Sequence, residues 1–140
     1  MQLGDTESPL KTYIENTPNG KEIPDETFKR RHIGVLAFTL ALLPFVFGVS
    51  RMVGAESITG AELPVIPMLH SVVGSGMVLG LVVTAAVPAL SRRVRAATGA
   101  VAFMAQASVL AYFTGGFIEA HFLYFVGVGV VALYEDWVPF

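Results

Sequence analysis

Long uncharged, apolar runs dominate the chain after a polar N-terminal stretch. Of the twenty charged residues (nine Lys and Arg plus eleven Asp and Glu), eleven lie within residues 1–31. The later uncharged runs approach the roughly 20 apolar residues that a membrane-spanning helix needs. We therefore predict an all-α, polytopic membrane helix bundle with about four transmembrane helices over residues 32–140, preceded by a polar tail over 1–31.

Charges and turn-forming residues delimit the expected spans. The first contains Pro44, which a helix in a membrane bundle tolerates. The run from Ala96 to Tyr134 is too long for one span, so we expect 114–116 (Thr-Gly-Gly) to form a turn between two. The four spans are predicted at about 33–50, 63–90, 96–113 and 117–134.

The distribution of Lys and Arg predicts the orientation. One basic cluster precedes the first span and another follows the second, so both fall on the same side of the membrane, against Arg51 alone on the other. Because Lys and Arg favour cytoplasmic loops, we expect a multi-pass plasma-membrane protein with both termini and the polar tail in the cytoplasm. The clusters are Lys29, Arg30, Arg31 and Arg92, Arg93, Arg95.

Composition excludes several functional classes. The formal net charge is −2, which gives no reason to expect a nucleic-acid partner. Cysteine is absent, which excludes disulfides, thiolate metal sites and cysteine nucleophiles. No glycine-rich phosphate loop and no Ser-His-Asp arrangement is recognisable, so we expect no enzyme. The expected partners are the lipid bilayer and either further copies of the chain or a signalling protein.

Three ionisable residues in the apolar part of the chain are the candidate site. Such groups are expensive in hydrocarbon and usually serve a function there. His70 lies roughly 10 Å into the second span and His121 roughly 6 Å into the fourth, both from the outer side, at 1.5 Å per residue. With Glu119 they are expected to converge in the outer half of the bundle.

The chemistry of these side chains leaves the cofactor open. Two histidines and a carboxylate suit a transition metal such as Cu, Zn or Fe, with His70, Glu119 and His121 as ligands. His70 and His121 alone would suit the two axial positions of haem b. Glu119 and His121 are two residues apart and point about 200° apart on a regular helix. Both would face one site only if Gly115-Gly116 unwound the first turn of the fourth span.

Structural interpretations compete with these functions. Either histidine would also serve as a hydrogen-bonding group, between helices for His70 or at the membrane interface for His121. Glu119 would also be favourable as an exposed carboxylate near a helix N-terminus.

Two C-terminal segments resemble a known family. The runs GGFIEAHF (115–122) and ALYEDWVPF (132–140), with MLHS (68–71) and RRVR (92–95), resemble the N-terminal multi-spanning membrane sensor module of some methyl-accepting chemotaxis proteins, histidine kinases and diguanylate cyclases. The resemblance covers about residues 30–140. It implies a membrane-embedded sensory input domain with His70, Glu119 and His121 at its ligand or metal site. Leu42 and Leu123 stand where those relatives often carry histidine.

Three functions follow as hypotheses. The first is a sensory input module that binds a metal, haem or a small ligand in the outer half of the bundle and signals to a cytoplasmic partner. The second is a b-type haem or redox membrane subunit. The third is a cofactor-free structural or assembly subunit whose small-residue faces, including Gly76 and Gly80, bind a partner.

Overall fold

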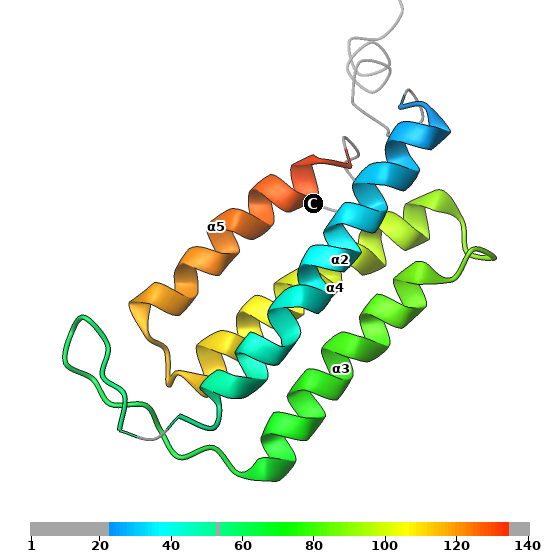
Figure 1. Ribbon diagram of the computed structural model, residues 1–140. Coiled ribbons are helices and arrows are strands. Elements are labelled where there is room, and N and C mark those ends of the chain that lie inside the picture. The colour runs from blue at the N-terminus through cyan, green and yellow to red at the C-terminus, as the bar shows by residue number, and fades with distance from the viewer. Residues whose placement is uncertain (1–22, 53, 135–140) are drawn as a thin grey trace, which may run out of the picture.

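The computed structural model describes residues 23–52 and 54–134, and within them the fold is all-α, as predicted. The helices are α2 (Asp25–Val49), α3 (Met68–Ala86), α4 (Arg92–Phe113) and α5 (Ile118–Ala132). Successive helices run in opposite directions and lie side by side (Figure 1). Residues 1–22 of the predicted tail and residues 135–140 of the ALYEDWVPF run lie outside the described residues.

Within the described residues, three helices are long and apolar enough to cross a membrane: α2, α3 and α4 have 25, 19 and 22 residues. Helix α5 is apolar but has only 15 residues, or about 22 Å at 1.5 Å per residue. The hydrocarbon core of a bilayer is about 30 Å thick. The fourth expected span is therefore the shortest of the set.

Helix α4 is the centre of the bundle. It packs against α2, α3 and α5, whereas α5 packs extensively on α4 alone. Its buried face is rich in small residues, which let neighbouring backbones approach closely. These small residues are Ala96, Gly99, Ala100, Ala102 and Ala107.

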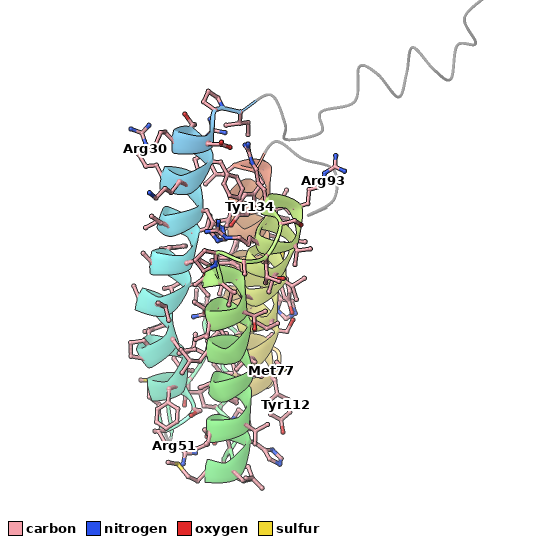
Figure 2. The ribbon with its side chains drawn as sticks, turned by 90° about the vertical axis from the view of Figure 1, so that its right-hand side faces the viewer. Arg30, Arg51, Met77, Arg93, Tyr112 and Tyr134 are labelled. Atoms are coloured by element: carbon pink, nitrogen blue, oxygen red, sulfur yellow. The ribbon has the colours of Figure 1, made fainter. Side chains whose placement is uncertain are left out.

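The two ends of the bundle differ in charge. The end that carries Arg30 and Arg93 is called the basic end here, and Tyr134 lies toward it (Figure 2). The opposite end carries Arg51 and the connection between α2 and α3, and is called the loop end (Figure 2). Both basic clusters therefore lie at one end of the bundle, which is the arrangement that the orientation argument requires.

Helices extend beyond the expected apolar spans at the basic end. Helix α2 begins at Asp25, so residues 25–31 of the predicted polar tail are part of the first helix. Asp25 and Glu26 occupy its first turn, where negative charge is favourable, and Phe28 is buried. Helix α4 begins at Arg92, so its basic cluster lies in a first turn and not in a loop.

The second expected span is shorter as a helix. Helix α3 starts only at Met68, so residues 63–67 of the second expected span, which include Pro64 and Pro67, precede the helix. Pro67 has extended backbone angles (φ −56°, ψ 140°). Among the glycines of α3, Gly74 is the one that packs closely against α4, because a Cβ there would lie 3.2 Å from Phe113 Cζ. A Cβ at Gly76 or Gly80 would meet nothing within 4 Å.

Two turns shape the loop end. The connection between α2 and α3 forms a short hairpin, in which Ser57 N donates to Ala61 O (2.8 Å) and Leu63 N to Ala55 O (2.9 Å). The predicted turn between the last two helices is confirmed. Gly115 and Gly116 adopt positive φ angles of 67° and 88°, which glycine reaches without steric cost.

Candidate functional site

His70 lies beside a shallow groove between α3 and α4, toward the loop end. The groove has a volume of about 380 Å³, and its walls are almost entirely apolar. The His70 Nδ1 atom forms a hydrogen bond of 2.7 Å with the Tyr112 hydroxyl, and both side chains are exposed on the bundle surface. The groove is lined by Leu69, His70, Val73, Gly74, Ser108, Val109, Tyr112 and Phe113.

Glu119 fastens the hairpin to the start of α5. Its Oε1 atom accepts a hydrogen bond of 2.7 Å from the backbone N–H of Ile58, at the tip of the hairpin. The other oxygen, Oε2, is buried and has no hydrogen-bond partner among the described residues. One oxygen of this carboxylate is therefore committed to holding the loop in place.

His121 is bound within its own helix. Its Nδ1 atom donates to the carbonyl oxygen of Phe117 (2.8 Å), one turn earlier. Its ring lies beside Tyr124, with 6.0 Å between ring centroids. Tyr124 in turn donates from its hydroxyl to Ser108 Oγ of α4 (2.9 Å).

No hydrogen bond joins any two of His70, Glu119 and His121 in the described part of the chain. Helix α5 is regular from Ile118 onward, so the glycine pair does not turn Glu119 and His121 toward one site. Over residues 23–52 and 54–134, no three His, Asp or Glu side chains lie close enough to hold a metal ion together. The fit to a three-ligand metal is therefore poor, and binding by any of these residues stays a prediction.

A fourth polar group, not selected from the sequence, lies at the basic end. His32 of α2 is completely buried, although histidine is usually only partly so. Its Nδ1 atom is 2.9 Å from the Tyr134 hydroxyl, and its Nε2 atom is 2.9 Å from the carbonyl oxygen of Ala85 in the last turn of α3. The ring stacks on Phe28, with centroids 5.4 Å apart and planes 9° apart.

These contacts define the protonation pattern of the neutral imidazole. A carbonyl oxygen only accepts, so His32 Nε2 carries the hydrogen and donates it to Ala85. Nδ1 is then the acceptor for the Tyr134 O–H. The imidazole also satisfies one of the carbonyl groups that a helix C-terminus leaves without an intrahelical partner.

Two arginines of α4 lie beside the residues that contact His32. The Arg92 guanidinium lies 4.4 Å from the centre of the Phe28 ring and 3.2 Å from the Asp25 carboxylate. Arg95 Nε approaches the Ala85 carbonyl oxygen at 3.4 Å. His32 and its contacts therefore join α2, α3 and α4 to Tyr134, which lies just after α5.

The sequence does contain a signal for His32. His32 directly follows three basic residues at the polar boundary of the first expected span, where a polar side chain is ordinary. Phe28, Val35 and Thr39 are nevertheless spaced four, three and four residues around it, which is helical spacing, and all three are buried. That periodicity places His32 on the buried face of the helix.

Comparison with known proteins gives one informative match. No protein-family model matches the chain, and no solved structure matches it. Transducer protein Htr8 of Halobacterium salinarum is 46% identical over 132 residues, which cover 94% of this chain and 20% of the relative. The chain thus spans about a fifth of that relative's length. It is related to a transducer protein, and this relation with the three apolar helices indicates a membrane protein.

Proposed function

We propose that this chain is a membrane-embedded sensory input module, which receives a stimulus at its loop end and passes it to a cytoplasmic signalling partner from its basic end. The observation that carries the proposal is the 46% identity to a transducer protein along 94% of the chain. An identity this high over almost the whole chain supports a shared role for the matching segments. In this proposal the loop end faces outward and both termini face the cytoplasm.

The groove beside His70 is the proposed receiving site. Its apolar walls suit a small ligand dissolved in the outer half of the bilayer, and the exposed His70 and Tyr112 side chains offer hydrogen bonds at its edge. Glu119 and His121 are proposed to act beside it, at the start of α5. A small ligand fits this arrangement better than a metal held by three residues.

An exchange of segments tests the sensory role. The matching segment of the Halobacterium salinarum transducer would be replaced by this chain, in a strain that lacks the native transducer. We expect the chimera to restore the motility response that distinguishes wild-type cells from the strain without the transducer. A chimera that is present in the membrane at normal abundance but restores no response contradicts the proposal.

The nature of the ligand needs a separate experiment. The chain would be purified in mild detergent, and a visible spectrum and elemental analysis would be recorded beside the His70→Ala/His121→Ala double variant. We expect no stoichiometric metal, because the described residues assemble no three-residue site, and no Soret band, because the groove is lined by His70 but not by His121. A haem band or near-stoichiometric Cu, Zn or Fe that the double variant loses would overturn the small-ligand proposal.

A further inference from the structure

Helix α5 is held at both ends and packs along its length mainly on α4. At the loop end, Glu119 Oε1 accepts the hydrogen bond from Ile58 N. Toward the middle, a Cβ at Gly127 would lie 2.8 Å from Met104 Cε of α4, so the two helices are close there. The helix thus connects the outer hairpin to the basic end over about 22 Å.

At the basic end, two consecutive residues of α2 hold two consecutive residues that follow α5. Arg31 Nη1 donates to the carbonyl oxygen of Leu133 (2.9 Å), and His32 Nδ1 accepts from the Tyr134 hydroxyl (2.9 Å). These four residues are called the latch here. Figure 2 shows Tyr134 at the same end of the bundle as Arg30 and Arg93.

The buried half of the latch is the hydrogen bond between His32 and Tyr134, and little else is available to replace it. His32 and Tyr134 are both almost completely buried, so bulk water does not compete for their hydrogen bond. The Tyr134 hydroxyl lies against α4, since a Cβ at Gly99 would be only 2.8 Å from it. A small displacement of Tyr134 therefore breaks the bond without offering the hydroxyl an equivalent position, and elements of this kind have two states instead of a continuous range.

We propose that α5 is the signalling helix of the module and that the latch is its output contact. A stimulus that changes how Glu119 holds the hairpin shifts α5 along α4, Tyr134 leaves His32, and the end of α5 changes its position against α2. This inference rests on the proposed sensory function and adds the route of the signal. In this route Glu119 acts through its hydrogen bond to the hairpin, which needs no bound metal.

The absence of cysteine makes the latch accessible to distance measurements. Spin labels would be attached to Lys29→Cys in α2 and Leu133→Cys after α5, both of which replace exposed side chains. The distance distribution between the labels would be measured by pulsed electron resonance in lipid nanodiscs. With the latch closed we expect one narrow distribution.

Tyr134→Phe tests the latch itself. It removes only the hydroxyl that His32 accepts from, and we expect a second, longer distance to appear. Tyr124→Phe is the matched control, because it removes a tyrosine hydroxyl that donates from α5 to Ser108 of α4, outside the latch. An unchanged distribution in Tyr134→Phe, or the same change in Tyr124→Phe, would overturn the latch.

Glu119 substitutions test whether α5 carries a signal. Glu119→Ala removes the acceptor for Ile58 N at the loop end, and we expect it to populate the longer distance between the labels at the basic end, which is the opposite end of the bundle. Glu119→Gln keeps an oxygen acceptor and is expected to match the wild type. A purely structural latch would respond to Tyr134→Phe but not to Glu119→Ala, and that result would overturn the relay.

The two proposals fail separately. The distance measurements use no stimulus, so they judge the coupling within the chain whatever the chain senses. A relay that behaves as expected, together with a chimera that restores no motility response, would refute the sensory function alone. A functional chimera whose labels do not respond to Glu119→Ala would refute the relay alone.

Discussion

Gly99→Ala is the substitution that most sharply examines the packing around His32. The added Cβ would lie 2.8 Å from the Tyr134 hydroxyl oxygen, 3.5 Å from His32 Cε1 and 3.6 Å from Leu36 Cδ2. Only the first distance is too short for an ordinary contact. The hydroxyl has little room to retreat, because it is bonded to a completely buried imidazole.

Two opposing effects determine how much Gly99→Ala changes the free energy of unfolding. Overpacking a well-filled interior typically costs about 1–3 kcal/mol. Replacing glycine by alanine inside a helix favours the folded state by about 0.8–1 kcal/mol. We therefore expect Gly99→Ala to lower the free energy of unfolding by up to about 2 kcal/mol in the wild-type background.

The effect of Gly99→Ala on the free energy of unfolding should change sign when the Tyr134 hydroxyl is absent. Tyr134→Phe alone leaves His32 Nδ1 without its donor and should cost between about 0.6 and 3 kcal/mol. In that background Gly99→Ala no longer meets a short contact, and only the helix preference of alanine remains. Gly99→Ala should then raise the free energy of unfolding by up to about 1 kcal/mol.

The assay is a double-mutant cycle of unfolding in mixed micelles, titrated with sodium dodecyl sulfate and followed by circular dichroism. Gly76→Ala is the control, because its Cβ would meet nothing within 4 Å and its effect should be equal in both backgrounds. If Gly99→Ala had the same effect with Tyr134 and with Phe at that position, the packing argument would be refuted.

Two further substitutions test the interior of the bundle. Gln106→Leu should raise the free energy of unfolding by about 1–3 kcal/mol in the same titration, because neither amide atom of this buried side chain has a partner among the described residues; a loss of stability would contradict this. Gly127→Leu should separate α5 from α4, where Met104 lies close, and lower the midpoint of unfolding. Gly129→Leu, in open space on the same helix, should leave the midpoint nearly unchanged, and equal effects would disprove the close α4–α5 packing.

The helical fold was predictable because charge and turn residues mark its limits. Arg51 and the Thr114-Gly115-Gly116 turn separate apolar runs whose length suits helices. The helix ends were less predictable. Asp25 starts a helix inside the polar tail because Phe28 finds a buried position among residues distant in sequence, and local composition does not show this.

The side-chain contacts at the candidate site were even harder to predict from the sequence than the helix ends. His70, Glu119 and His121 were selected by depth along the chain, but depth does not specify which way a side chain points around its helix. In the structure each of them is hydrogen-bonded to a group outside this trio: Tyr112, Ile58 N and Phe117 O. The buried partners of His32 come from Ala85 and Tyr134, 53 and 102 residues away, and only the packed bundle brings them together.

Orientation in the membrane is the claim on which an outer receiving site and a cytoplasmic latch both depend. Single cysteines would be introduced at Lys29, Ile58, Arg93 and Leu133 in the cysteine-free chain, and intact cells would be treated with a membrane-impermeant maleimide. The account predicts labelling of Ile58→Cys from outside, and labelling of the other three only after the membrane is opened. Labelling of Leu133→Cys in intact cells would show that α5 does not cross the membrane, and would contradict the account.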